Sequence, residues 1–317
     1  MIAALLVIFI HAQIPGVVGD VILTVARLAV PFFFMVSGYY TFGKPANVLI
    51  KRAKKTFILC FCSFAIYFLW ELFLAVTRGH VPETIFKWLS LETLIEAFVF
   101  NEGVIKHLWF LLALAYCYLL YIIFSKASAK VKLTVVIILL AASYAITLIC
   151  LSNGLENPSY YSKNFLFDGL PHFLLGSIIK QRSEKLFDIK AYLLWIITAG
   201  GIIISLIESI LIGEFDLYIG TTVACVALFV ILAFEKIPVS DRLSLWGNKF
   251  SGDIYIIHML VLAFINIATS IFFTLLSIPN ILSNDIFLTI RPFLLFASCF
   301  IAALLKDKLL SLIKKQK

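Results

Sequence analysis

The sequence predicts an all-α fold, a polytopic membrane helix bundle of about ten transmembrane helices with both termini in the cytoplasm. Of its 317 residues, 62% are hydrophobic and 14% are charged, whereas a soluble domain of this size is about one-quarter charged. The mean hydropathy is +1.05. Apolar runs recur along the whole chain, and clusters of Lys and Arg follow every second run, which is the pattern that orients spans in a bilayer.

The predicted spans are apolar runs close to the roughly 20 residues that cross the hydrocarbon core, although the first is shorter. In chain order they lie at residues 1–14, 18–42, 56–76, 107–125, 133–152, 165–180, 191–212, 217–234, 250–274 and 287–305. No repeat or low-complexity tract separates them. We therefore expect one integral-membrane domain over residues 1–317.

The net charge of +8 is explained by topology. Most of the 26 Lys and Arg lie in the loops after every second span or at the C-terminus. The opposite loops contain only Arg78, Lys87, Lys106 and Lys163. Because basic residues are retained on the cytoplasmic side, this asymmetry needs no nucleic-acid partner.

The longest segment on the outer side covers residues 77–106. Apolar residues from Ile85 to Phe98 recur there at helical spacing, and Glu83, Lys87, Glu92 and Glu96 occupy other positions. The pattern predicts an amphipathic helix lying on the outer membrane surface. A short helix that covers the bundle is an equally good interpretation.

The cysteines and the absence of common catalytic motifs reduce the number of candidate functional residues. The six cysteines all fall in apolar runs without a Cys-x-x-Cys pair, so we interpret them as small buried hydrophobes. No ligand cluster predicts a metal, and no nucleophile elbow, P-loop or dinucleotide motif is present. Ionisable residues within the spans, which are costly in a bilayer, are therefore the functional candidates.

His11 and Arg27 are the first of these candidates. A neutral imidazole can take a proton from an attacking hydroxyl, although a lone histidine at a span end is more often structural. Arg27 lies inside the second span, four residues before Pro31, which is expected to bend the helix. It either pairs with a carboxylate such as Glu71 or Glu208, or provides a fixed cation for a phosphate or an oxyanion.

Five ordered patches of sequence carry a resemblance to a known family. They are Ile8-Phe-Ile-His-Ala12, Arg27-Leu-Ala-Val-Pro-Phe-Phe-Phe-Met-Val-Ser-Gly-Tyr39, His107-Leu-Trp-Phe-Leu111, Asp168-Gly-Leu-Pro-His172 with Phe173-Leu-Leu-Gly176, and Tyr255-Ile-Ile-His258. Together they resemble the acyltransferase-3 family, polytopic enzymes that acylate cell-surface carbohydrates and related molecules. The family's signature arginine, about three helical turns before the histidine, would precede Met1, so we expect the first helix to be N-terminally truncated.

The resemblance implies a role for each candidate residue. The catalytic pair would be His11, as general base, and Arg27. The donor-binding residues would be Lys51, Arg52 and Lys55. The acceptor side would include His107, Trp109, Asp168, His172 and His258. Simpler interpretations stay open: positive-inside charge for the basic cluster, an aromatic belt for Trp109, and helix capping for Asp168.

The function implied is membrane O-acylation in a bacterial plasma membrane. Acyl-CoA, with acetyl as the usual group and succinyl an alternative, would be a cytoplasmic co-substrate, with no bound cofactor. The acceptor would be a hydroxyl of a cell-surface glycan or lipid-linked molecule, and membrane lipid would surround the protein. The alternative is a transporter or exporter of polysaccharide or small polar solutes, since transporters also use embedded charges and broken helices. A related alternative is a family member that serves an amino-acid racemase.

Overall fold

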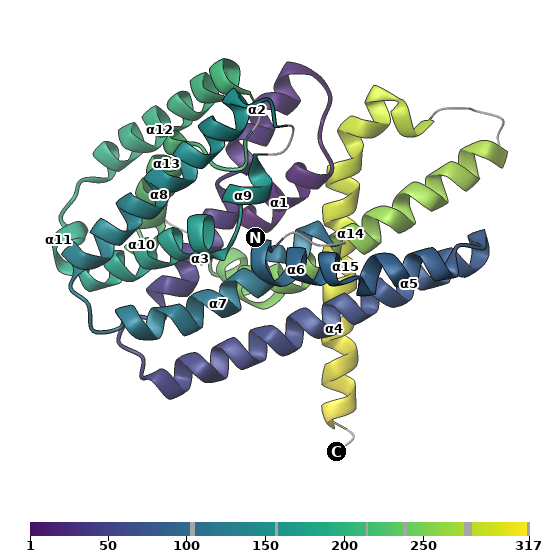
Figure 1. Cartoon of the computed structure of the whole chain (residues 1–317), viewed down its shortest axis with the longest axis horizontal. Helices are drawn as coiled ribbons and strands as arrows, with labels where there is room; N and C mark the ends of the chain where they lie inside the picture. Colours follow the sequence, from purple (N-terminus) through teal and green to yellow (C-terminus); the bar gives the residue numbers. More distant parts are fainter. Residues whose placement is uncertain (102–104, 156–157, 214, 237–239, 276–280, 316–317) are drawn as a thin grey trace. The chain divides into compact units, whose positions relative to one another are not determined.

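The computed structural model is helical throughout the part of the chain that it describes (Figure 1). It describes all residues except 102–104, 156–157, 214, 237–239, 276–280 and 316–317. Helices account for 86% of the structure, and the described residues form no strand. The predicted all-α class is confirmed.

The helices before residue 130 are α1 (Ile2–His11), α2 (Gly16–Ala26), α3 (Ala29–Tyr39), α4 (Ala46–Arg78), α5 (Val81–Leu89), α6 (Leu91–Ile95), α7 (Trp109–Phe124) and α8 (Ala129–Ser152). The later ones are α9 (Ser159–Ser162), α10 (Leu170–Gln181), α11 (Ser183–Phe187), α12 (Ala191–Ile212), α13 (Ile219–Ala233), α14 (Asp241–Leu275) and α15 (Asp285–Lys315). Short π-helical turns at Glu96–Phe100 and Phe165–Gly169, and 3-10 turns at Lys106–Leu108 and Ile281–Ser283, complete the described helices.

Seven described segments are long and apolar enough to cross a membrane, which makes the chain a multi-pass membrane protein. They are Gly16–Tyr39, Ala46–Arg78, Lys106–Phe124, Ala129–Ser152, Ala191–Ile212, Asp241–Leu275 and Asp285–Ile313. The other three predicted spans correspond to shorter helices, α1, α10 and α13. Ten crossings and cytoplasmic termini therefore stay predictions.

The described chain forms two compact units. Unit 1 consists of Met1–Ala29 and Glu235–Lys317, and unit 2 of Val30–Phe234. In unit 1, α1 packs against α2, α14 and α15, and α14 packs against α15. The ring of Phe9 on α1 meets that of Phe293 on α15 edge-on, with 5.6 Å between centroids.

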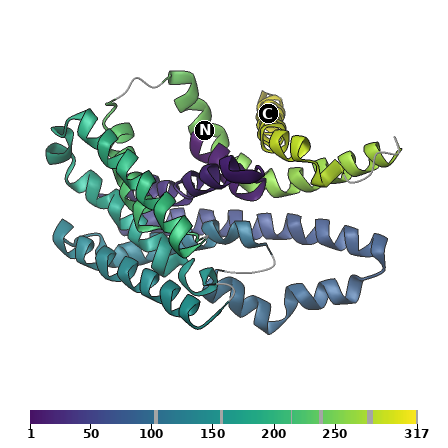
Figure 2. The ribbon, with the colours of Figure 1, turned by 90° about the horizontal axis from the view of Figure 1, so that it is seen from above.

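Three helix pairs build most of unit 2. Helix α4 lies beside α7, α8 beside α10, and α12 beside α13, as Figures 1 and 2 show. In the third pair, a Cβ on Gly201 would lie 2.6 Å from the backbone nitrogen of Ala224. This glycine therefore lets α12 and α13 approach closely, as small residues do at membrane helix interfaces.

Two glycines also set the approach of α3 to α10. A Cβ on Gly38 would lie 1.8 Å from the carbonyl oxygen of Phe173, and one on Gly176 would lie 2.0 Å from that of Met35. Any larger side chain would overlap the facing backbone. The glycines of the two motifs, Gly38 and Gly176, are therefore explained by helix contact.

Glu208 has a structural partner in unit 2 that the sequence did not identify. Its two carboxylate oxygens accept hydrogen bonds from the backbone N–H groups of Ile219, at 3.2 Å, and Gly220, at 3.0 Å. These groups open α13, whose N-terminus favours a negative charge. Glu208 is an N-terminal cap supplied by the neighbouring helix.

The basic cluster lies in a helix, whereas the sequence placed it in the loop between two spans. Helix α4 begins at Ala46, after Pro45 in extended conformation, and so contains Lys51, Arg52 and Lys55. The apolar run from residue 56 underestimates the length of this helix, because Lys and Arg also favour helix formation.

The segment 77–106 differs from the single predicted helix. Helix α4 ends at Arg78, followed by left-handed Gly79 with φ of +76°, and Ser90 separates α5 from α6. The hydroxyl of Ser90 accepts a hydrogen bond from the N–H of Thr93 at 3.2 Å, which caps α6. Residues 102–104 lie outside the described part.

Both interpretations of that segment find support within unit 2. Trp88 is buried against the rings of Phe64 and Phe68 on α4, with centroids 6.4 Å and 5.2 Å away. Phe86 and Leu91 are 75% and 74% exposed. One face thus covers the bundle, and the other presents apolar side chains outward.

Candidate functional site

Unit 1 brings two candidate histidines together. His11 is the last residue of α1 and is half-buried, whereas His258 lies within α14 and is 0% exposed. Their ring centroids are 5.0 Å apart, and the ring planes are inclined by 40°. The resemblance assigned His11 to proton abstraction and His258 to the acceptor side. The sequence did not predict that the two rings are in contact.

The ring of His258 is held in one orientation by its own helix. Its Nδ1 lies 2.7 Å from the carbonyl oxygen of Tyr255. Because a carbonyl only accepts, we assign the hydrogen to Nδ1, and Nε2 of the neutral ring then carries the lone pair. The Tyr-x-x-His spacing therefore has a backbone explanation.

Arg27 lies where the second predicted span is interrupted. Helix α2 ends at Ala26 and α3 begins at Ala29. The ring of Pro31 removes an N–H and clashes with the carbonyl four residues earlier, which belongs to Arg27. The structure thus shows an interruption of the helix at Arg27, which is half-buried, and the bend itself stays a prediction. A bilayer tolerates such a freed carbonyl only where protein or water satisfies it.

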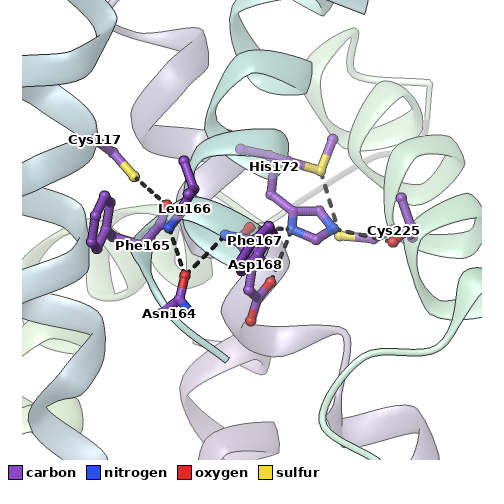
Figure 3. Close-up of polar contacts among 10 residues, drawn as sticks. Cys117, Asn164, Phe165, Leu166, Phe167, Asp168, His172 and Cys225 are labelled. Carbon is purple, nitrogen blue, oxygen red and sulfur yellow. Dashed lines mark hydrogen bonds and ion pairs between the residues drawn. The ribbon is translucent and has the colours of Figure 1, made fainter. Parts of the chain in front are cut away.

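In unit 2, Asp168 and His172 face each other across one turn (Figure 3). The Nδ1 of His172 lies 2.7 Å from the carbonyl oxygen of Asp168 and 3.0 Å from its carboxylate Oδ1. The shorter contact takes the single N–H, so Oδ1 contacts the ring edge without accepting a full hydrogen bond. The four-residue spacing places both side chains on one face of the turn, and both residues are buried.

The second nitrogen of His172 also has a partner. Its Nε2 lies 3.2 Å from the hydroxyl of Thr222 on α13. Since Nδ1 donates, the Thr222 hydroxyl donates to Nε2. The imidazole thereby connects the start of α10 to α13.

Capping at this turn is performed by Asn164 rather than Asp168. The side-chain oxygen of Asn164 accepts hydrogen bonds from the N–H groups of Leu166, at 2.9 Å, and Phe167, at 3.0 Å (Figure 3). An asparagine is a preferred N-cap. The carboxylate of Asp168 is thus left for His172.

His107 and Trp109 lie at the start of α7 and are 5% and 7% exposed. The His107 ring packs edge-on against Tyr67, with 4.8 Å between centroids. The ammonium of Lys163 lies 5.7 Å from the centre of the Trp109 ring and 3.6 Å from a carboxylate oxygen of Asp216. Because Trp109 is buried beneath a cation, it does not belong to a lipid-facing aromatic belt.

The members of the basic cluster point in different directions. Arg52 donates from Nη1 to the carbonyl of Tyr40, at 3.2 Å, and to the hydroxyl of Thr41, at 2.9 Å. Lys51 and Lys55 are exposed on α4. Arg52 thus stabilises the end of α3, and the two lysines are open to solvent or ligand.

Three residues that complete these contacts were not singled out from sequence: Asn164, Lys163 and Thr222. Only Asn164 carried a local signal, since an asparagine before a helical run favours a cap. The other two act across long sequence separations. In the described part of the chain, no three His, Cys, Asp or Glu side chains gather as metal ligands.

Comparisons with known proteins cover most of the chain. A protein-family model described as an acyltransferase domain matches residues 1–306. A curated protein named "Serine/alanine racemase", from Enterococcus gallinarum, is 30% identical over 238 residues, which are 64% of this chain and 31% of that protein. The chain thus spans about a third of that relative's length. No solved structure matches it significantly.

Proposed function

Because this chain belongs to the acyltransferase-3 family, we propose that it is a membrane O-acyltransferase that uses His11 as its general base. The observation that carries the proposal is the contact of His11 with His258, whose rings lie 5.0 Å apart. A half-buried imidazole beside a second, oriented imidazole is suited to receiving a proton from a hydroxyl.

The proposed donor is cytoplasmic acyl-CoA, with acetyl as the transferred group, and the proposed acceptor is a hydroxyl of a cell-envelope carbohydrate. This assignment is supported by the family and by the basic residues of the predicted inner side. The proposal also includes ten crossings of a bacterial plasma membrane, with both termini on the cytoplasmic side. The racemase activity named for the relative is not included, since most of that protein lies outside the alignment.

The proposed reaction conserves atoms and charge. His11 removes the proton of the acceptor hydroxyl while its oxygen attacks the thioester carbonyl, giving a tetrahedral oxyanion. The carbon–sulfur bond then breaks, an ester remains on the acceptor, and the coenzyme A thiolate takes the proton from the imidazolium. A thioester is already activated, so deprotonation and oxyanion stabilisation are the main requirements.

The other candidates receive supporting roles in this proposal. Arg27 would stabilise the oxyanion or a donor phosphate, and the cluster of Lys51, Arg52 and Lys55 would bind the phosphates of coenzyme A. The residues proposed to act on the acceptor are His107, Trp109, Asp168 and His172 in unit 2 and His258 in unit 1.

The proposal is tested by incubating membranes that contain the protein with radiolabelled acetyl-CoA and measuring base-labile label in envelope material. General base catalysis contributes about 10²–10⁴-fold, so His11→Ala should lose nearly all transfer. His80→Ala is the matched control, because His80 is exposed at the start of α5 and has no proposed role.

Folding of each variant is checked by fluorescence-detected size-exclusion chromatography. If folded His11→Ala retains most of the transfer, the proposed mechanism is wrong. Transport would then become the better hypothesis, and uptake or export of labelled glycan in vesicles would be the next measurement.

A further inference from the structure

Three cationic side chains of unit 2 converge on residues 39–42, which are the last residue of α3 and the turn after it. We call these residues the 39–42 turn. Arg52 comes from α4, Lys132 from α8 and Lys180 from α10. All three belong to the side that the charge pattern predicts to be cytoplasmic. No ion pair in the described part of the chain includes any of them.

Arg52 and Lys180 contact the turn from its accessible side. Arg52 donates to the carbonyl of Tyr40 and to the hydroxyl of Thr41. The Nζ of Lys180 lies 5.0 Å from the centre of the Tyr39 ring. Lys180 is exposed, so its ammonium is open to a ligand while the ring holds it over the turn.

Lys132 lies under the same turn and is 0% exposed. Its Nζ donates to the oxygens of Ser177, at 3.1 Å, Gln181, at 3.2 Å, and Tyr121, at 3.4 Å. The ring centre of Phe42 is 5.1 Å away. Each N–H of the ammonium therefore has an acceptor, but all three acceptors are neutral, so the buried charge is solvated without being neutralised.

The charge of this cluster exceeds what the fold requires. A helix C-terminus carries only about half a negative charge. Lys180 lies in the last turn of α10, so the ends of α3 and α10 together leave roughly two positive charges near the turn. Burying a cation without an anionic partner is costly. An oxygen of an anionic group from outside the chain would neutralise part of this charge.

We propose that the 39–42 turn binds a phosphate group, with Lys180 and Arg52 contacting its oxygens. Lys132 is the positioning residue, because it supports the turn from below and adds a fixed positive charge. The inference rests on the proposed function in taking coenzyme A as the source of the phosphate. An anionic lipid headgroup offers the same chemistry and is the second source.

The test is coenzyme A binding to the full chain in phosphatidylcholine nanodiscs, measured by isothermal titration calorimetry. Lys180→Gln should weaken binding about tenfold to a hundredfold, as expected for one lost charge-assisted hydrogen bond. Lys180→Arg should retain most of the affinity. Lys185→Gln, which removes a charge from an exposed position on nearby α11, should leave it unchanged.

Lys132→Met tests the positioning role. We expect it to raise the KM for acetyl-CoA with kcat retained, whereas a purely structural lysine would lower both or prevent folding. If Lys132→Met does not fold, the Lys180 pair of variants still decides the proposal.

A second arm distinguishes the source of the phosphate. For this arm, phosphatidylglycerol is added to the discs and the melting temperature is measured. A rise for the wild type but not for Lys180→Gln would support the site with lipid as its ligand. Equal coenzyme A affinity and equal lipid stabilisation in wild type and Lys180→Gln would overturn it. Lys180-dependent binding in a protein that transfers no acetyl group would refute the proposed function and leave this site standing.

Discussion

Replacing Gly176 by alanine should weaken the fold at the crossing of α3 and α10. The new Cβ would lie 2.0 Å from the carbonyl oxygen of Met35, against 3.4 Å for ordinary contact, so the backbones would have to separate by about 1.4 Å. Overpacking of this kind costs about 1–3 kcal/mol. The helix preference of alanine over glycine offsets only about 0.5–1 kcal/mol. We therefore expect a net loss of up to about 2.5 kcal/mol.

The matched control is Gly200→Ala, where a Cβ on α12 meets nothing within 4 Å. The same substitution there should be neutral or slightly stabilising. Thermal unfolding of the purified protein in detergent, followed by tryptophan fluorescence, compares the two variants. A melting temperature of Gly176→Ala at or above that of Gly200→Ala would refute the close-contact argument.

Three further outcomes are expected. Glu208→Ala should lower the free energy of unfolding by about 1–3 kcal/mol, because the N–H groups of Ile219 and the buried Gly220 lose their acceptor; an unchanged melting temperature would show that this cap does not stabilise the fold. Reporter fusions at Gly213 and Lys236 should give opposite sides of the membrane, and the same side for both would break the topology. Replacing Lys51 and Lys55 together by glutamine should raise the KM for acetyl-CoA more than it lowers kcat; an unchanged KM would leave these lysines a role in topology alone.

Features set by local sequence could be predicted, and those set by distant packing could not. The contact of Asp168 with His172 follows from a four-residue spacing, and the break at Arg27 follows from Pro31. The contact of His11 with His258 depends on α1 packing against α14, from the other end of the chain. No periodicity in either segment encodes that contact.

Buried basic residues are a second feature that could not be predicted from the sequence. A lysine in a positively charged segment is ordinarily interpreted as solvated, yet Lys132 is 0% exposed. Its burial depends on Ser177 and Gln181 from α10, and only the tertiary structure reveals these acceptors. The positive-inside rule assigns Lys132 to the correct group of basic residues, but it does not predict whether the side chain is buried or exposed.

His172 and His258, both 0% exposed, are oriented in the same way, although they lie in different units. His172 donates its Nδ1–H to the carbonyl four residues earlier, and His258 donates to the carbonyl three residues earlier. In both, the helix backbone fixes the tautomer and directs Nε2 away from its own turn. The spacing in Asp-x-x-x-His and Tyr-x-x-His therefore serves ring orientation first, and the side chain at the earlier position can act separately. Asp168 accordingly places a buried carboxylate oxygen beside an imidazole that the helix backbone already orients.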